Sequence, residues 1–227
     1  PSRILLTGQE GIGKFTFALH LINYLFSKNE SARYDLNKNS INTESSSYRL
    51  VNNLSHPNFY LIRKQEDKKN IDIEQIRQMI NFLNKSSFNN YKKIILIDGV
   101  ENLNISSANA LLKNLEESNL KNLFILIHDI TQKIPETVKS RCISYQLNFD
   151  FSDIEHVVYE YFNENLYLNL NQDFKVITFS PEFIINHINF INENKLDLNT
   201  YDIEKTIRYI IDKKSYKKNN FIINSFQ

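Results

Sequence analysis

Short hydrophobic runs alternate along the chain with longer segments in which hydrophobic residues recur every three or four positions. The first pattern is typical of strands buried on both faces, and the second of amphipathic helices. The runs predict strands at Arg3–Thr7, Phe59–Ile62, Lys93–Val100, Asn122–Ile127 and Cys142–Leu147. The periodic segments predict helices at Phe15–Phe26, Ile71–Leu83, Ser106–Glu117 and Pro135–Ser140.

Strands that alternate with helices form βαβ units, whose strands lie parallel in one sheet. We therefore expect an α/β domain over residues 1–150, with a parallel sheet flanked by helices. The strand pattern fades near residues 148–152, and a second, helical domain is expected over residues 151–227. Residues 27–57 are rich in Ser, Asn and Lys, which is typical of an exposed loop or an insertion. The helices of the second domain are expected at Asp153–Phe162, Pro181–Asn192 and Thr200–Lys213.

Glycine is scarce in this chain, and most of it lies in one loop. The chain has 4 glycines in 227 residues, against a usual content of about 7%. Gly8, Gly11 and Gly13 stand between the first predicted strand and the first helix, and Lys14 follows. This GxxxxGK spacing is that of a P-loop, in which backbone N–H groups and a helix N-terminus surround a phosphate. The sequence therefore predicts a phosphate-binding loop.

The residues that a P-loop enzyme uses for hydrolysis are incomplete here. Phe15 stands where Ser or Thr normally ligates Mg²⁺, and Thr16 lies about 100° further around the helix. Asp98 ends a hydrophobic strand, as in a Walker B element, but Gly99 replaces the glutamate that activates water in hydrolysing P-loop proteins. Binding of ATP or ADP and a loop kept only for packing both remain open. The candidate nucleotide site consists of Gly8, Gly11, Gly13, Lys14, Thr16 and Asp98.

A second segment carries a more specific signal than the P-loop. Ala108–Glu117 reads ANALLKNLEE, and it resembles the segment that follows Walker B in bacterial clamp-loader AAA+ subunits. Ser140-Arg141-Cys142 resembles the Ser-Arg-Cys motif of the same family, and His56-Pro57 resembles a pattern of its delta-prime branch. The resemblance covers about residues 3–150. It implies an AAA+ fold with a helical lid.

Within that family, Phe15 and Gly99 favour the delta-prime type over the hydrolysing gamma/tau type. The resemblance then implies a non-hydrolysing subunit of a DNA polymerase III clamp loader. Such a subunit would work with gamma/tau and delta subunits to load the sliding clamp on primed DNA in replication. The resemblance also implies that Arg141 is an arginine finger for ATP held by a neighbour; a surface or packing arginine is the alternative. Residues 28–57 contain no cysteine, so the zinc module of gamma/tau subunits is not expected.

Charge and cysteine content exclude further classes of protein. The 27 basic and 26 acidic residues give a net charge of +1, unlike the strong positive charge of an independent nucleic-acid-binding domain. One cysteine, Cys142, excludes a disulfide framework within the chain. The chain has no hydrophobic stretch of transmembrane length and no secretion signal. We therefore expect a cytoplasmic protein without membrane contact.

Two other functions remain as alternatives. An active small P-loop ATPase or kinase would use Lys14, Thr16 and Asp98. A P-loop-derived interaction module would use no nucleotide. The chain does not begin with Met, so we expect a fragment or a processed start. The family that the chain resembles usually ends in a helical collar domain; residues 213–227 are too few to form it, so we expect this domain to be truncated or reduced.

Overall fold

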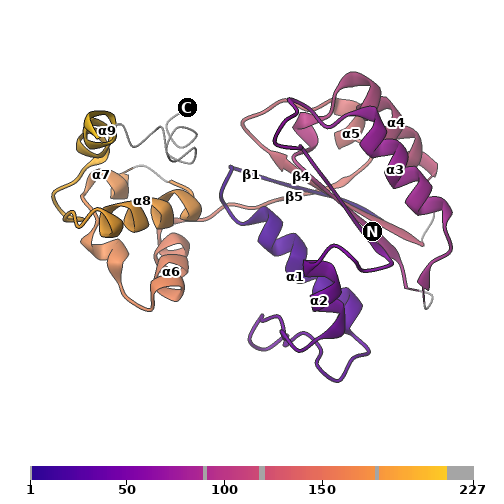
Figure 1. The fold of residues 1–227 in the computed structure, drawn as a ribbon, viewed down its shortest axis with the longest axis horizontal. Helices are drawn as coiled ribbons and strands as arrows, with labels where there is room; N and C mark the ends of the chain where they lie inside the picture. The colour runs from indigo at the N-terminus through magenta and orange to yellow at the C-terminus, as the bar shows by residue number, and fades with distance from the viewer. Residues whose placement is uncertain (1, 89–90, 118–120, 177–178, 214–227) are drawn as a thin grey trace. The chain divides into compact units, whose positions relative to one another are not determined.

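A computed structural model describes residues 2–88, 91–117, 121–176 and 179–213. These residues form two compact units (Figure 1). The first contains residues 2–9 and 14–147, and the second contains residues 10–13 and 148–213. The first unit is an α/β layer structure, and the second is helical.

The first unit is built on a five-stranded parallel sheet with the order β2-β3-β4-β1-β5. Each of the predicted hydrophobic runs forms one of its strands, which confirms the predicted parallel sheet. The register places Ile95 opposite Phe124, and Phe124 opposite Arg3. The strands are β1 (Arg3–Gly8), β2 (Phe59–Arg63), β3 (Lys93–Asp98), β4 (Asn122–Asp129) and β5 (Ile143–Gln146).

Helices cover both faces of this sheet. Successive side chains of a strand point to opposite faces, so each strand contributes to two hydrophobic cores. In β3, Ile94 and Leu96 belong to one hydrophobic core, whereas Ile95 and Ile97 belong to the other. Burial on both faces explains why the strand is hydrophobic throughout. The first core packs against α1 (Lys14–Ser27) and α2 (Ser46–Asn52), and the second against α3 (Ile73–Asn84), α4 (Ile105–Glu117) and α5 (Glu136–Lys139), with the short helix η2 (Val100–Asn102) beside them.

Part of the segment after α1 is helical, because Ser46–Asn52 form α2 and Glu30 caps the start of that helix. The Glu30 carboxylate accepts hydrogen bonds from Ser47 N (3.0 Å), Ser47 Oγ (2.5 Å), Ser46 N (3.0 Å) and Ser45 Oγ (2.8 Å). These bonds pair N–H groups that have no partner inside the helix. Burial raises the pKa of Glu30, but the bonds from Ser47 and Ser45 outweigh it, and the net pKa lies below the ordinary value. The loop prediction was therefore wrong for the residues of α2.

The second unit consists of short helices around a separate hydrophobic core. Its core residues include Ile154, Val158, Phe174 and Ile188. Among the described residues, no helix is long and hydrophobic enough to span a membrane. The helices are α6 (Phe151–Phe162), η3 (Leu166–Asn169), α7 (Asp173–Val176), α8 (Pro181–Glu193) and α9 (Ile203–Asp212).

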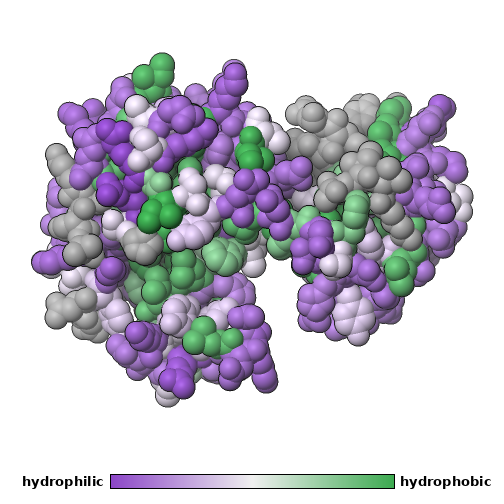
Figure 2. Space-filling view, turned by 180° about the vertical axis from the view of Figure 1, so that it is seen from behind, coloured by the Kyte–Doolittle hydropathy of each residue, from purple (hydrophilic) through white to green (hydrophobic). Residues whose placement is uncertain are grey.

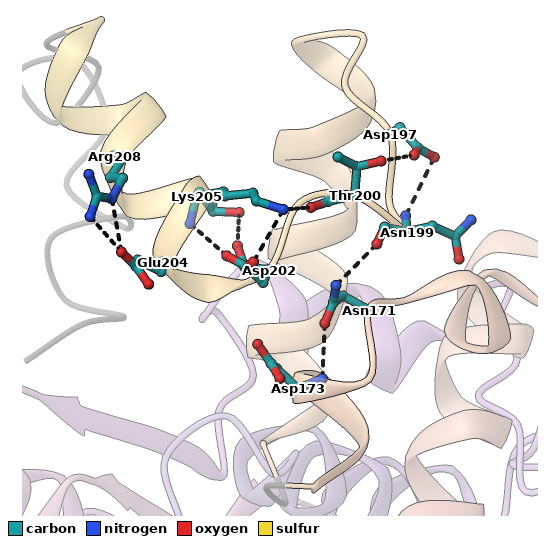
Figure 3. Close-up of polar contacts among 10 residues, drawn as sticks. Asn171, Asp173, Asp197, Asn199, Thr200, Asp202, Glu204, Lys205 and Arg208 are labelled. Atoms are coloured by element: carbon teal, nitrogen blue, oxygen red, sulfur yellow. Dashed lines mark hydrogen bonds and ion pairs between the residues drawn. The ribbon is translucent and has the colours of Figure 1, made fainter.

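Polar contacts fix the turn that leads from α8 into α9 (Figure 3). Asp197 accepts hydrogen bonds from Asn199 N (3.4 Å) and from Thr200 Oγ1. Lys205 Nζ donates to the Thr200 carbonyl at 3.0 Å, and Asp202 accepts from Lys205 N at 2.7 Å as the N-cap of α9. The start of α9 is thus set by a capping aspartate, two residues after the predicted Thr200.

Hydrophilic side chains make up most of the face shown in Figure 2, with hydrophobic residues among them. Scattered hydrophobic residues are normal on a protein surface. The edge strand β5 is the part of the sheet with the most exposed residues: Ile143 is 51% and Tyr145 is 50% exposed.

Candidate functional site

The loop between β1 and α1 has the backbone that its glycines predict. Gly11 has a φ of 74° and Gly13 a φ of 91°, values that residues with a Cβ atom rarely adopt. In the part of the chain that the structure describes, no other group lies within 4 Å of the place that a Cβ atom of Gly13 would take. Backbone conformation, and not crowding, is therefore the reason for glycine at position 13.

Lys14 is the first residue of α1, and its side chain folds back onto the loop. Its Nζ donates hydrogen bonds to the carbonyls of Gly8 (2.7 Å) and Gln9 (2.5 Å). The residue is only 7% exposed. Lys14 thus stabilises the curled loop. In a nucleotide-binding P-loop, the lysine at this position contacts a phosphate. The bonds to the Gly8 and Gln9 carbonyls give the lysine a structural function that needs no nucleotide.

The two residues after Lys14 lie in different surroundings. Phe15 packs against the hydrophobic core beneath α1, so the position of the usual Mg²⁺ ligand serves the core. Thr16 is exposed, and the helical turn places it about 100° away from Phe15. Among the described residues, no group of three or more His, Cys, Asp or Glu side chains is placed to hold a metal ion.

Asp98 and the start of the P-loop both lie at the carboxyl ends of strands of the sheet. Asp98 is the last residue of β3 and pairs with Ile127 of β4, which in turn pairs with Leu6 of β1. Two strand spacings, about 10 Å, therefore separate Asp98 from Leu6, two residues before the end of β1. Asp98 is half-buried. The register places Gly8 and Asp98 at the carboxyl ends of their strands, and Lys14 bonds the Gly8 carbonyl there.

Gly99 has a structural reason to be glycine. It is left-handed, with φ 79° and ψ 65°, and it begins η2. Its carbonyl accepts a hydrogen bond from Asn102 N at 3.0 Å, and a Cβ atom here would come within 2.5 Å of Asn102 Nδ2. A glutamate at this position would have to adopt the same strained conformation. The absence of the water-activating carboxylate is thus linked to the turn after Asp98.

We expect Gly99→Ala to lower the free energy of unfolding by about 1–2 kcal/mol, because an L-residue is strained in the left-handed region. Gly99→Glu should be at least as destabilising and should produce no ATP turnover. Urea denaturation measures the first effect and an ATPase assay the second. Gly99→Ala in an Asn102→Ala background separates backbone strain from the contact with Asn102, since only strain persists there. A Gly99→Ala protein as stable as the wild type would contradict the account.

Glu101 and His128 lie near Asp98 and the end of β4. Glu101 Oε2 accepts a hydrogen bond from Asp129 N at 3.3 Å, and burial raises the pKa of Glu101. His128 Nε2 lies 3.0 Å from the Gln132 carbonyl, and its buried Nδ1 has no hydrogen-bond partner among the described residues. Sequence spacing alone carried no signal for Glu101, because its contact is with a strand far along the chain.

Arg141 lies in the turn between α5 and the edge strand β5. Its Nε donates to Glu116 Oε1 at 2.8 Å, its Nη1 donates to the Thr137 carbonyl at 2.8 Å, and its Nη2 also bonds Glu116. The next residue, Cys142, packs against the core. Burial raises the pKa of the Cys142 thiol to about 11, against a smaller lowering by Arg3. Cys142 is therefore an unreactive anchor for the arginine.

The His56-Pro57 pattern is structural in this chain. His56 stacks on Phe26 with ring centroids 3.9 Å apart, and its Nδ1 accepts a hydrogen bond from Asn58 N at 3.2 Å. The buried Asn58 side chain pairs with both backbone groups of Phe88, at 2.7 and 2.8 Å. These contacts join α1 to the start of β2 and to the segment before β3.

Comparison with known proteins gives a family match over the first unit. The family described as DNA polymerase III, delta subunit, matches residues 1–150. A DNA polymerase III subunit delta′ from Pseudomonas aeruginosa is 30% identical over 139 residues, which are 61% of this chain and 40% of that protein. The delta′ subunit of Bacillus subtilis is 30% identical over 139 residues, covering 61% and 39%. A gamma subunit from Buchnera aphidicola is 40% identical over 76 residues, covering 34% and 21%.

Two solved structures align with this chain. A DNA polymerase III gamma subunit-related protein from Thermotoga maritima has a TM-score of 0.49 at 18% identity, covering 74% of this chain and 48% of that chain. The Thermotoga maritima RuvB Holliday junction branch migration motor has a TM-score of 0.46 at 14% identity, covering 92% and 61%. The chain spans about 40% of the length of the delta′ relatives it matches. With residues 1–150 matched, the chain belongs to the DNA polymerase III delta subunit family, and the relatives at about 30% identity place it with the delta′ subunits.

Proposed function

We propose that this protein is a non-hydrolysing, delta′-like subunit of a clamp loader in DNA replication. Residues 1–150 act as an AAA+ domain with a degenerate nucleotide site, and residues from 151 onward act as its helical lid. The observation that carries the proposal is the left-handed Gly99, which stands where a hydrolysing subunit needs a glutamate. Phe15 supports it, because its partly buried side chain packs against the core and has no oxygen to ligate Mg²⁺.

The proposed partners are gamma/tau and delta subunits, the sliding clamp, and primed DNA reached through the complex. Membership of the delta subunit family and the similarity to delta′ and gamma subunits support this assignment. Arg141 acts on ATP held by a neighbouring subunit. Its position directly before the edge strand β5 supports that role, because an edge strand is open to contact with another chain.

ATP or ADP bound at the candidate nucleotide site would not be hydrolysed there. The glycine conformations at positions 11 and 13 and the places of Gly8 and Asp98 at the carboxyl ends of their strands support binding. The bonds from Lys14 to the loop carbonyls support a packing function instead. Either case leaves the proposed clamp-loader role unchanged, since the hydrolysed ATP belongs to the neighbour.

The test is reconstitution with gamma/tau and delta subunits. We expect the chain to co-purify with them and to show negligible ATPase activity when assayed alone with Mg-ATP. Strong turnover by the isolated chain would instead support the small ATPase or kinase. Failure to co-purify, together with no nucleotide binding, would support the P-loop-derived interaction module.

A further inference from the structure

The Arg141 guanidinium is held by its own chain along one edge. Nε and Nη2, which form that edge, both bond the same carboxylate oxygen of Glu116, and Nη1 bonds the Thr137 carbonyl. The Arg141 side chain is 32% exposed and that of Glu116 is 52% exposed. The arginine is therefore fixed on one side and accessible on the other.

Glu116 itself stands on a fixed support. It lies in the last turn of α4, and the preceding carbonyl, that of Leu115, accepts a hydrogen bond from Arg3 Nη1 at 2.6 Å. Arg3 begins β1, an inner strand of the sheet, so the end of α4 is tied to the sheet. A cation at a helix C-terminus also stabilises that end of the helix.

The backbone of Arg141 is fixed independently of its side chain. Arg141 N donates to the Val138 carbonyl at 3.2 Å, and Cys142 N donates to the Lys139 carbonyl at 3.1 Å. With the backbone set by the turn after α5 and the guanidinium set by α4, few rotamers of the long arginine chain remain. Because its rotamers are already restricted, Arg141 loses less conformational entropy on binding a phosphate than a freely rotating arginine would.

The donor inventory shows what the fixed arginine can still bind. A guanidinium has five N–H donors, and three hydrogen bonds to protein groups are formed within the described residues. No described residue accepts from the other two donors, one on Nη1 and one on Nη2, so they can bind another acceptor. Two N–H donors on one guanidinium match the geometry of a phosphate.

The same contact joins the two segments that carry the family resemblance. Glu116 belongs to Ala108–Glu117, and Arg141 belongs to Ser140-Arg141-Cys142. The two residues are 25 positions apart in the chain, and the fold brings them into an ion pair. We propose that Glu116 is a positioning residue, which orients the Arg141 guanidinium so that its remaining donors reach the phosphate of a neighbouring subunit's nucleotide. The proposal rests on the proposed function, because the hydrolysis it affects takes place in that neighbour.

The experiment uses the reconstituted clamp loader and measures kcat and KM for DNA-stimulated ATP hydrolysis. The variants are Glu116→Ala, Glu116→Gln, Arg141→Ala and the double variant Glu116→Ala with Arg141→Ala. Glu136→Gln is the matched control, because Glu136 forms an exposed ion pair with Lys139 at 2.9 Å on the neighbouring helix and has no bond to Arg141.

We expect Glu116→Ala to lower kcat about 10- to 100-fold, because a small misplacement of a catalytic group has effects of that size, and to leave KM nearly unchanged. Glu116→Gln should retain most of the activity, since its amide oxygen still accepts from Nε and Nη2. The double variant should be no slower than Arg141→Ala alone, and Glu136→Gln should behave as wild type.

Each other result overturns a defined part of the argument. A normal rate in Glu116→Ala, with a slow Arg141→Ala, removes the positioning role and leaves the finger. A normal rate in Arg141→Ala removes the finger and thereby the proposed role of Arg141. A faster Glu116→Ala protein would show that Glu116 restrains the arginine. Additive losses in the double variant would show that Glu116 acts through stability and not through Arg141.

Discussion

Replacing Arg141 with alanine is expected to slow ATP hydrolysis at the neighbouring subunit about 10³-fold or more. A finger arginine stabilises negative charge that develops on the transferring phosphoryl group, and such residues contribute 10³–10⁵ in rate. The measurement is single-turnover hydrolysis in a reconstituted clamp loader whose other ATP sites are disabled. Assembly should be unaffected, because the Arg141–Glu116 pair is partly exposed and such pairs contribute little to stability.

Two further variants separate this role from a general effect of positive charge. Arg141→Lys keeps the charge but loses the planar fork that binds two phosphate oxygens, so its rate should stay far below that of the wild type. Arg208→Ala removes an exposed arginine that forms a comparable ion pair with Glu204, at 2.6 Å on α9, and should have no effect. If Arg141→Ala assembles normally and hydrolyses ATP at the wild-type rate, Arg141 is not a finger.

The sheet of this protein could be predicted from sequence because its strands are buried on both faces. The run at Lys93–Val100, for example, became β3 at Lys93–Asp98, since no polar face interrupts it. The predicted helix at Phe15–Phe26 became α1 at Lys14–Ser27 for a related reason: one apolar stripe faces the core. Helix ends were less certain, because caps decide them. The helix predicted to start at Ser106 begins at Ile105, and Asn104 Oδ1 accepts from Ser107 N at 2.9 Å.

The features that the sequence did not predict depend on contacts between distant residues or on a backbone angle. Helix α2 lies in a Ser- and Asn-rich segment and is capped by Glu30, 15 to 17 positions earlier in the chain. The Glu116–Arg141 pair joins two motifs. Each motif can be recognised in the sequence, but the contact between them is seen only in the structure. Gly99 was recognised as a missing carboxylate, whereas its left-handed turn, which accounts for the glycine, follows only from the structure.

The ring of His187 is buried in the core of the second unit. It is 5% exposed, and its ring packs against Phe174 in a tilted arrangement, with centroids 4.2 Å apart and an interplanar angle of 35°. Its Nε2 has no hydrogen-bond partner among the described residues. Burial lowers the pKa of His187 to about 4. In this setting the imidazole is a neutral core residue.

Acid should therefore destabilise the second unit through this histidine. In the unfolded chain its pKa is about 6.5, so below that pH the unfolded state binds a proton that the folded state does not. The free energy of unfolding then falls as the pH drops, by about 1.4 kcal/mol per unit between the two pKa values, and in total by about 3 kcal/mol. The contribution is intact above pH 6.5 and is lost by about pH 4.

His187→Leu removes the titrating group and fills the same apolar site, so it should remove this part of the acid sensitivity. Urea denaturation at pH 7 and pH 5 should show a variant that is more stable than wild type at pH 5 by about 2 kcal/mol beyond any difference at pH 7. His156→Gln is the matched control, because His156 is exposed on α6; it should keep the wild-type pH dependence. If wild type and His187→Leu lose the same stability between pH 7 and pH 5, the folded protein binds the proton without penalty. His187 would then have a polar environment that its aromatic neighbours do not provide.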